Sequence, residues 1–325
     1  MSDRITLGHG SGGRLMHQLL DEFKKVFDLP GLEDAHEIED RIALTADSFV
    51  VKPIFFPGGD IGRLAVTGTI NDLAMKGAIP RYLMITYIIE EGFPIDDLVK
   101  ISESAQKIAD EVGIKIVGGD TKVVEKGKGD GIYITTFGVG IIPDGISLST
   151  DRIEPGDRIV INGPIGDHGV AIINAREGFG LATDLKSDCA PLSQLVQEML
   201  KVGGVKFMRD PTRGGVATIL NEVYQETGYG IIIVEEELPI RPEVRGACEL
   251  LGIDPLYVAN EGKVIAFTKG DPGDIIRVMR QNRYGGGSCC IGRVEEDLDG
   301  VYLKTRIGSL RPLIMLSADP LPRIC

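Results

Sequence analysis

Apolar residues recur along the first half of the chain with the spacings of strands and helices. Glycine-rich segments that permit tight turns separate these runs. Apolar and β-branched runs predict strands at 42–51, 81–90, 114–117 and 132–139. Apolar positions at helical spacing predict helices at 61–76 and 95–112. The polar stretch 125–131 predicts an exposed loop between the last two strands.

The same kind of pattern restarts after a polar segment at 148–156. The second half predicts strands at 158–162, 231–234 and 263–268, and helices at 167–176, 190–202 and 216–225. Because strands and helices alternate in both halves, each half is predicted to be a mixed α/β unit. We therefore expect two domains and a tail, at residues 1–150, 151–305 and 306–325.

The composition is typical of a globular protein. The 325 residues are 43% hydrophobic and 26% charged, and the length exceeds that of one ordinary core. The net charge of −13 argues against a nucleic-acid partner, which requires clustered Lys and Arg. No run of 18 apolar residues and no apolar signal segment is present, so no membrane partner is expected. Five cysteines, an odd number, argue against a disulfide framework and predict a cytoplasmic location.

Residues 8–13 (GHGSGG) contain the pattern G-x-G-x-x-G, which is typical of dinucleotide sites. That fingerprint needs a preceding strand within a βαβ unit, and only seven residues come before it here. Apolar residues at helical spacing follow from Leu15 to Phe23, so the loop's N–H groups lie beside a helix N-terminus and favour an anion. We interpret the segment as a phosphate-binding loop, and a plain N-terminal loop is the alternative.

Three aspartates stand at predicted element ends and have apolar or small neighbours. They are Asp47 in TADS, Asp72 in INDL and Asp120 in GGDT. Solvated aspartates usually occur in polar stretches, whereas Mg²⁺ binds carboxylate oxygens and bridges to phosphate. Beside a phosphate-binding loop, the three carboxylates would form a magnesium–nucleotide site. Taken singly, each aspartate is better interpreted as a helix cap or a turn residue.

Two segments of the second half carry further candidate ligands. In residues 210–215 (DPTRGG), Arg213 stands beside two glycines and is a candidate clamp for a phosphate or carboxylate. The alternative is that Asp210 and Thr212 only cap the helix that follows. In residues 260–262 (NEG), Glu261 is a candidate base, and a simple turn is the alternative.

The chain ends on a cysteine, Cys325. Pro312, Pro320 and Pro322 precede it and hold the backbone extended, because proline cannot continue a helix. The last eight residues would span roughly 25 Å if extended. This geometry suits a swinging arm that carries a group on its thiol into an active site. A frayed terminus is the alternative.

These motifs, in this order, resemble the ATP-binding superfamily of aminoimidazole ribonucleotide synthetase, selenophosphate synthetase and thiamin-monophosphate kinase. The resemblance covers essentially the whole chain, and the terminal residues 322–325 (PRIC) are similar to those of one branch, the HypE hydrogenase maturation factors. It implies an N-terminal α/β domain whose sheet pairs with its copy across a homodimer. It also implies a C-terminal α/β domain beside the first, with ATP bound between the two.

The resemblance further implies a reaction. The carbamoyltransferase HypF would load a carbamoyl group onto Cys325, and ATP would drive its dehydration to a thiocyanate. The cyanide would pass to iron on the HypC–HypD complex for [NiFe]-hydrogenase. The chemistry is sensible because an amide-like oxygen leaves poorly until a phosphoryl group is transferred to it. Phosphoryl transfer depends mainly on positioning and on charge neutralisation.

Individual roles are implied by the same resemblance. Asp47, Asp72 and Asp120 would hold Mg²⁺ and phosphate. A base must remove the N–H protons, and the candidates are Lys122 and Glu261. Lys122 would act as a base only if it is buried, and otherwise as a phosphate clamp. The residues implied to hold ATP are His9, Gly10, Ser11, Gly12, Gly13, Thr45, Asn71, Lys122, Asp210, Thr212, Arg213 and Gly214.

Other functions compete with this one. Selenophosphate synthetase is expected to carry cysteine or selenocysteine in its N-terminal glycine-rich region, but no cysteine precedes Cys189 here. A small-molecule ATP-dependent kinase or synthetase of the same superfamily gives no reason for a terminal cysteine. A non-catalytic carrier, with nucleotide as a switch, is the alternative outside enzymes, and stoichiometric ATP consumption would distinguish it.

Overall fold

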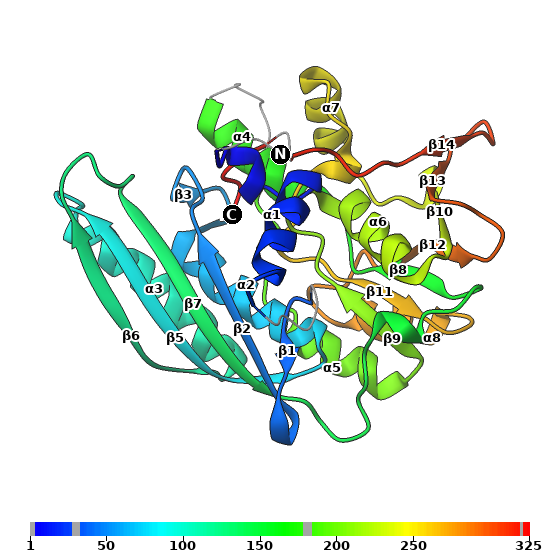
Figure 1. The fold of residues 1–325 in the computed structure, drawn as a ribbon, viewed down its shortest axis with the longest axis horizontal. Coiled ribbons are helices and arrows are strands. Elements are labelled where there is room, and N and C mark those ends of the chain that lie inside the picture. The colour runs from blue at the N-terminus through cyan, green and yellow to red at the C-terminus, as the bar shows by residue number, and fades with distance from the viewer. Residues whose placement is uncertain (1–3, 28–32, 178–183, 319–320) are drawn as a thin grey trace.

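Two β-sheets lie side by side, one in each half of the chain, with helices between and behind them (Figure 1). The structure is a computed structural model that describes residues 4–27, 33–177, 184–318 and 321–325. Each half combines strands and helices, which confirms the predicted mixed α/β class.

The first sheet has five strands in the order β1-β2-β7-β5-β6. Its only parallel pair is β5 with β6, and the other neighbours are antiparallel. Residues of β2 alternate between the helix-covered face and the opposite face, as expected for a strand covered on one side. The strands are β1 (His36–Glu37), β2 (Ile42–Phe49), β5 (Ile79–Glu90), β6 (Lys115–Val124) and β7 (Ile132–Ile141), and a separate pair comprises β3 (Phe55–Phe56) and β4 (Gly59–Asp60).

The helix α2 (Ile61–Met75) joins the two halves of the molecule. The Asp60 carboxylate caps it by accepting hydrogen bonds from Gly62 N and Arg63 N. Nearly every residue of α2 is buried, because the helix packs against β2 and β7 of the first sheet and against α5 and β9 of the second half. The amphipathic α3 (Ile95–Val112) packs beside it and ends at Gly113, whose φ of 75° is left-handed. The remaining helix of the first half is α1 (Arg14–Lys24).

The second sheet has seven strands in the order β14-β13-β10-β12-β8-β11-β9. Phe267 of β11 is fully buried against Phe207 of β9 at the centre of its core. The strands are β8 (Arg158–Ile161), β9 (Val205–Arg209), β10 (Gly230–Val234), β11 (Ile265–Thr268), β12 (Cys289–Glu295), β13 (Val301–Lys304) and β14 (Leu310–Pro312). The helices are α4 (Asp167–Glu177), α5 (Ser193–Val202), α6 (Gly215–Thr227), α7 (Pro242–Leu251) and α8 (Gly273–Gln281), and short 3₁₀ helices are η1 (Leu7–Gly10), η2 (Glu39–Arg41), η3 (Thr150–Arg152), η4 (Glu235–Glu237) and η5 (Pro255–Tyr257).

Several elements differ from those predicted. The strand predicted at 114–117 continues to Val124, so Asp120 lies inside β6 and not at its end. Asp47 and Asp72 likewise lie inside β2 and α2. The prediction that these aspartates stand at element ends was wrong, because β6 continues through its two glycines, and β2 and α2 extend beyond Asp47 and Asp72 to Phe49 and Met75. The helices and strands that the pattern did not reveal are β1, β3, β4, β9, α7, α8, β12, β13 and β14.

The tail is not a wholly extended arm. Residues 310–312 form β14 against β13, and Leu313 is buried in the second core. Further on, the carbonyls of Leu316 and Ser317 accept hydrogen bonds from Arg14 N and Leu15 N, at 3.0 Å each. They therefore satisfy two N–H groups at the start of α1 that no helical bond can reach. Pro320 lies outside the described residues.

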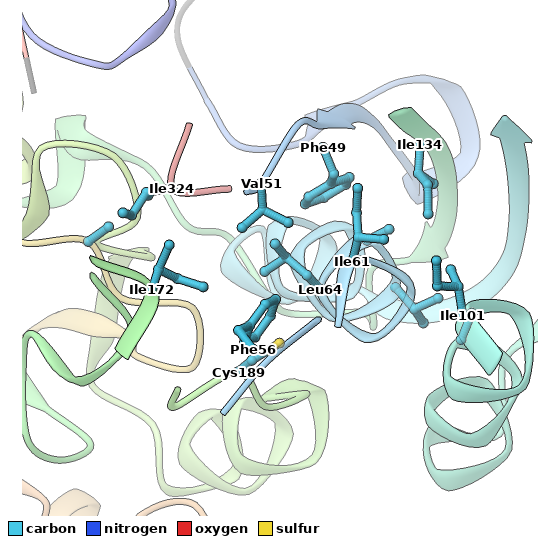
Figure 2. Close-up of a cluster of buried hydrophobic side chains, with 14 of the residues drawn as sticks. Phe49, Val51, Phe56, Ile61, Leu64, Ile101, Ile134, Ile172, Cys189 and Ile324 are labelled. Atoms are coloured by element: carbon cyan, nitrogen blue, oxygen red, sulfur yellow. The ribbon is translucent and has the colours of Figure 1, made fainter. Parts of the chain in front are cut away.

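The last residues are packed into the molecule. Leu321 and Ile324 are buried in the cluster that contains Phe49 and Ile172. Figure 2 shows Ile324 beside Ile172 at one end of this cluster. Two buried apolar side chains therefore anchor the terminal segment. This packing is not that of a frayed terminus.

Two adjacent glycines of β6 provide a test of this packing. A Cβ on Gly119 would lie 1.6 Å from Ile85 O of the neighbouring strand, whereas the nearest atom to a Cβ on Gly118 is Met84 Cε at 3.9 Å. We expect Gly119→Ala to displace β6 and to lower the melting temperature by several degrees, because backbone must move. Gly118→Ala, the matched control, should melt close to the wild type. Equal melting of the two variants in calorimetry would contradict this pairing of β5 and β6.

Candidate functional site

A cavity of about 380 Å³ lies between the two halves of the chain. It is lined by β2 and α2 from the first half and by the segment around β9 and α6 from the second. The structure brings together eight residues that the sequence analysis selected from distant segments. They are Gly12, Asp47, Asp72, Asp210, Thr212, Arg213, Glu261 and Cys325.

The first-half side chains reach the cavity because β2 and α2 approach each other closely. Thr45 and Asp47 share the helix-facing side of β2, and a Cβ on Gly68 of α2 would lie only 2.8 Å from Phe49. The Thr45 hydroxyl donates to the Asp72 carboxylate at 2.9 Å. Thr45 thus fixes Asp72, although it does not line the cavity itself.

Three carboxylates form a cluster at this cavity. Ligand oxygens of Asp34, Asp72 and Asp210 all lie within 4.8 Å of one another. Burial is the main cause that raises the pKa of Asp72 and Asp210 well above the usual value, and the neighbouring carboxylates add to it. Burial likewise raises the pKa of Asp34 to about 6. Within the described residues, Asp34 Oδ2 is buried without a hydrogen-bond partner. A divalent cation with oxygen ligands fits this donor set.

Asp47 stands next to that cluster and Arg213. Burial raises the pKa of Asp47, while the Arg213 guanidinium opposes the shift. Burial also disfavours the charge on Arg213, but Cys325 and Asp47 outweigh it and raise the pKa of this guanidinium. Arg213 Nη1 donates to Gly10 O at 3.2 Å, and so connects the glycine loop to the cavity. Gly214 follows with a φ of 73°, where a Cβ would lie 2.2 Å from Thr218 Oγ1.

Glu261 is the fully buried carboxyl on the second-half side. Burial raises its pKa well above the usual value, and Asp210 and Asp188 add to the effect. Among the described residues, its Oε1 is buried without a hydrogen-bond partner. Asn71 of α2 holds this segment, because its amide donates to Glu261 O at 3.3 Å and accepts from Leu192 N at 2.8 Å. Asn71 therefore fastens the two halves together and does not line the cavity.

The rest of the glycine loop lies beside a second cavity. His9, Gly10 and Ser11 line this space of about 290 Å³, and Arg213 and Cys325 line both cavities. Gly13 is the N-cap of α1, where a Cβ would lie 2.6 Å from Leu316 O. The loop is thus held against the tail and beside the acidic cavity.

Asp120 and Lys122 lie away from both cavities in this copy of the chain. They form an ion pair on the exposed edge strand β6, and 68% of the Lys122 side chain is exposed. Strands β7 and β5 separate β6 from β2, so Asp120 lies three strand spacings, roughly 14 Å, from the strand that carries Asp47.

The sequence analysis missed four residues of the site. Arg209 Nε lies 2.9 Å from Asp34 Oδ1, and Arg209 Nη2 lies 3.3 Å from Glu222 Oε2. His17 of α1 pairs with Glu222 at 3.0 Å. Asp34 and Glu222 raise the pKa of Arg209 against the opposing effect of burial. Of these four residues, only Arg209 could have been found from the sequence, because it directly precedes Asp210. The other three stand in no motif and reach the site only through pairing between distant segments.

The chain is similar to known proteins over essentially its full length. The carbamoyl dehydratase HypE of Cupriavidus necator is 48% identical over 335 residues, which cover 100% of this chain and 95% of that protein. A crystal structure of a HypE–HypF complex matches with a TM-score of 0.89 at 46% identity, over 92% of this chain and 99% of that chain. A HypE structure in complex with ATP matches with a TM-score of 0.85 at 42% identity, over 99% and 100%.

Models of both domains of AIR synthase related proteins also match. The N-terminal domain model matches residues 32–142, and the C-terminal domain model matches residues 154–304. The fold and the cavity therefore define an AIR synthase related protein. The chain is 48% identical in sequence to the Cupriavidus necator HypE over its full length. It therefore belongs to the HypE family of carbamoyl dehydratases. In the described part of the chain, no helix has the length and apolar character needed to cross a membrane.

The clustered carboxylates predict that removing one charge raises the melting temperature and lowers the turnover. Asp72→Asn removes one buried charge while its amide oxygen still accepts from Thr45. We expect the ligand-free variant to melt a few degrees higher, because like-charge repulsion and desolvation are relieved. Its ATP-dependent turnover should fall at least about a hundredfold, since a charge that stabilises phosphoryl transfer is lost. Asp144→Asn, on an exposed loop, is the control. A lower melting temperature for Asp72→Asn in calorimetry would contradict the electrostatic interpretation.

Proposed function

We propose that this chain uses ATP to dehydrate a carbamoyl group on the Cys325 thiol to a thiocyanate, the source of cyanide for the iron of [NiFe]-hydrogenase. The observation that carries the proposal is that Cys325 lines the same cavity as Arg213 and the acidic cluster. A relative named carbamoyl dehydratase and a similar structure with bound ATP support it.

The reaction balances without any oxidant or reductant. The carbamoyl oxygen attacks the γ-phosphorus of ATP, ADP leaves, and one N–H proton is removed as the C=N bond forms. The second N–H proton is then removed, the C–O bond breaks, and inorganic phosphate leaves as the C≡N bond forms. The carbamoyl oxygen therefore departs in phosphate, and the thiol sulfur stays bonded to carbon throughout.

Asp34, Asp72 and Asp210 would hold Mg²⁺ at this site, together with Asp47. Their crowding and raised pKa values support this role, because a divalent cation relieves the repulsion among buried carboxylates. When bound with ATP, Mg²⁺ would neutralise charge on the phosphate oxygens. Arg213 would contribute a fixed guanidinium beside the glycine loop, which suits phosphate recognition.

Glu261 is the base that the geometry supports best. It lines the cavity with Cys325, and its raised pKa makes the carboxylate a better proton acceptor near neutral pH. Because the Lys122 side chain is exposed, it is better suited to bind phosphate than to act as a base. Asp120 and Lys122 would act at the nucleotide of a second copy of the chain. In their own copy, β7 and β5 lie between their strand β6 and the strand β2 that lines the cavity.

A homodimer is part of this proposal. One face of the first sheet packs on α2 and α3, and the opposite face carries exposed apolar side chains. Phe137 of β7 and Met84 of β5 are register partners in the middle of this bare face, which also includes Leu44 and Ile88. Apolar patches of this kind mark interaction sites, and the resemblance of the motifs implied sheet pairing with a second copy.

Phe137→Glu tests the dimer. A buried charge in the middle of the sheet face would block association, so the mass from light scattering should fall from twice 35.0 kDa to 35.0 kDa. Phe23→Glu, which changes an exposed apolar residue on α1, should remain dimeric. A dimeric Phe137→Glu, or a monomeric wild type, would refute pairing through this face.

HypF would be the protein that loads the carbamoyl group, and the HypC–HypD complex would accept the cyanide in the cytoplasm. A similar chain has been solved in a HypE–HypF complex, which supports the first of these partners. None of the five cysteines, all of which lie within the described residues, forms a disulfide, which suits a reducing compartment.

Intact mass measurement tests the reaction itself. Incubation with HypF, carbamoyl phosphate and ATP should add one carbamoyl group, mapped to Cys325. Mg²⁺ and ATP added to the isolated carbamoylated protein should then remove one water with one ADP formed. Cys325→Ser should still bind ATP and should show no mass loss. ATP consumption without water loss would favour a nucleotide-switched carrier.

A further inference from the structure

Every carbonyl of the last four residues is held by a donor from the body of the protein. Arg176 donates from Nη1 to Pro322 O at 2.9 Å and from Nη2 to Arg323 O at 2.8 Å. His168 Nε2 lies 2.9 Å from Ile324 O. Val50 N donates to the backbone oxygen of Cys325 at 3.0 Å. Terminal residues of a domain are usually poorly ordered unless they are tied down, so these contacts fix the position of this terminus.

The donors are themselves fixed. Because a carbonyl only accepts, His168 must donate from Nε2, and its Nδ1 accepts from the Ser187 hydroxyl at 2.8 Å. Both ring nitrogens are therefore engaged, and the ring is fully buried against Phe56. Arg176 stands eight residues later on α4, on the same side of the helix as His168, and its Nε donates to Lys52 O at 2.9 Å.

The side chain of Arg323 adds a charged contact from the first half of the chain. It donates to Val50 O at 3.0 Å and pairs with the Asp130 carboxylate, which also accepts from Lys52 at 2.9 Å. Asp130 lies in the loop between β6 and β7, and Glu90 holds this loop by accepting hydrogen bonds from Gly127 N and Gly131 N. The tail therefore bridges both halves of the molecule beside the cavity.

We propose that His168, Arg176 and Asp130 are positioning residues, which hold the terminal pentapeptide 321–325 so that Cys325 enters the nucleotide cavity. Their contacts are to backbone oxygens and to Arg323, not to the atom that carries the group. The cradle, defined as these three residues with Val50 and Lys52, therefore seats the free, carbamoylated and cyanated tails alike. The effect of the cradle on the dehydration reaction rests on the proposed function, whereas the docking of the tail in the cradle does not.

The test uses the full chain with Arg176→Ala, Arg176→Lys and Asp130→Asn, since Arg176 and Asp130 are partly exposed and less essential for folding than His168. The first readout is the rate at which iodoacetamide alkylates Cys325, mapped by mass spectrometry, with buried Cys189 and Cys248 as internal controls. We expect Arg176→Ala to react at least about tenfold faster, because two charged hydrogen bonds to the tail are lost. Arg176→Lys should be intermediate, since an ammonium cannot span three carbonyls.

The second readout is the first-order rate of water loss from isolated carbamoylated protein at saturating ATP. It should fall about tenfold in Arg176→Ala with the KM for ATP unchanged, a split that a general structural defect would not give. Arg277→Ala, on the exposed side of α8, should match the wild type in both readouts. An alkylation rate equal to the wild type overturns the cradle, and faster alkylation with normal water loss overturns its positioning role. If wild-type protein loses no water, the proposed function fails, and alkylation alone still decides the docking.

Discussion

The burial of several carboxylates in one cavity is the constraint on which the rest of the structure depends. Asp34, Asp72 and Asp210 cannot all be charged at this spacing without compensation, since burial and mutual repulsion both disfavour ionisation. Arg209 and Arg213 supply part of the compensation. Asp34 and Glu222 favour the charge on Arg209, and Cys325 and Asp47 favour the charge on Arg213. The carboxylates that these arginines leave uncompensated fit the proposed ligand, which would bring a cation with it.

The terminal peptide has both a structural and a chemical role in this molecule. Leu321 and Ile324 belong to a hydrophobic core, and Leu316 and Ser317 cap the first helix, so the tail is part of the fold. Cys325 at its end lines the cavity, so the same segment also presents a reacting group. Under the proposed function, delivery of that group to another protein would require separation of the anchors from the core. The tail would then have to bind tightly enough to position the thiol and weakly enough to leave.

Local patterns predicted the elements that depend on local sequence. The helix predicted at 95–112 is Ile95–Val112 in the structure, because its apolar stripe is complete within the helix. The strand β9 was missed because it is buried on both faces and shows no alternation. Asp34 was missed because only its pairing with Arg209, far along the chain, brings it to the cavity. The motifs containing Asp47, Asp72 and Asp210 were selected correctly as neighbours, since each has unusual apolar or glycine-rich surroundings.

The loop between β6 and β7 gives the bare sheet face a mechanical connection to the terminal thiol. Glu90 belongs to β5, whose alternate residues form that face, and it fixes the loop that ends in Asp130. Asp130 in turn pairs with Arg323, two residues before the thiol. If the sheet face pairs with a second copy as proposed, this contact path joins the dimer interface to the tail, and any coupling between them would be reciprocal. In such a pair, each tail would be joined to the shared face by the same contacts.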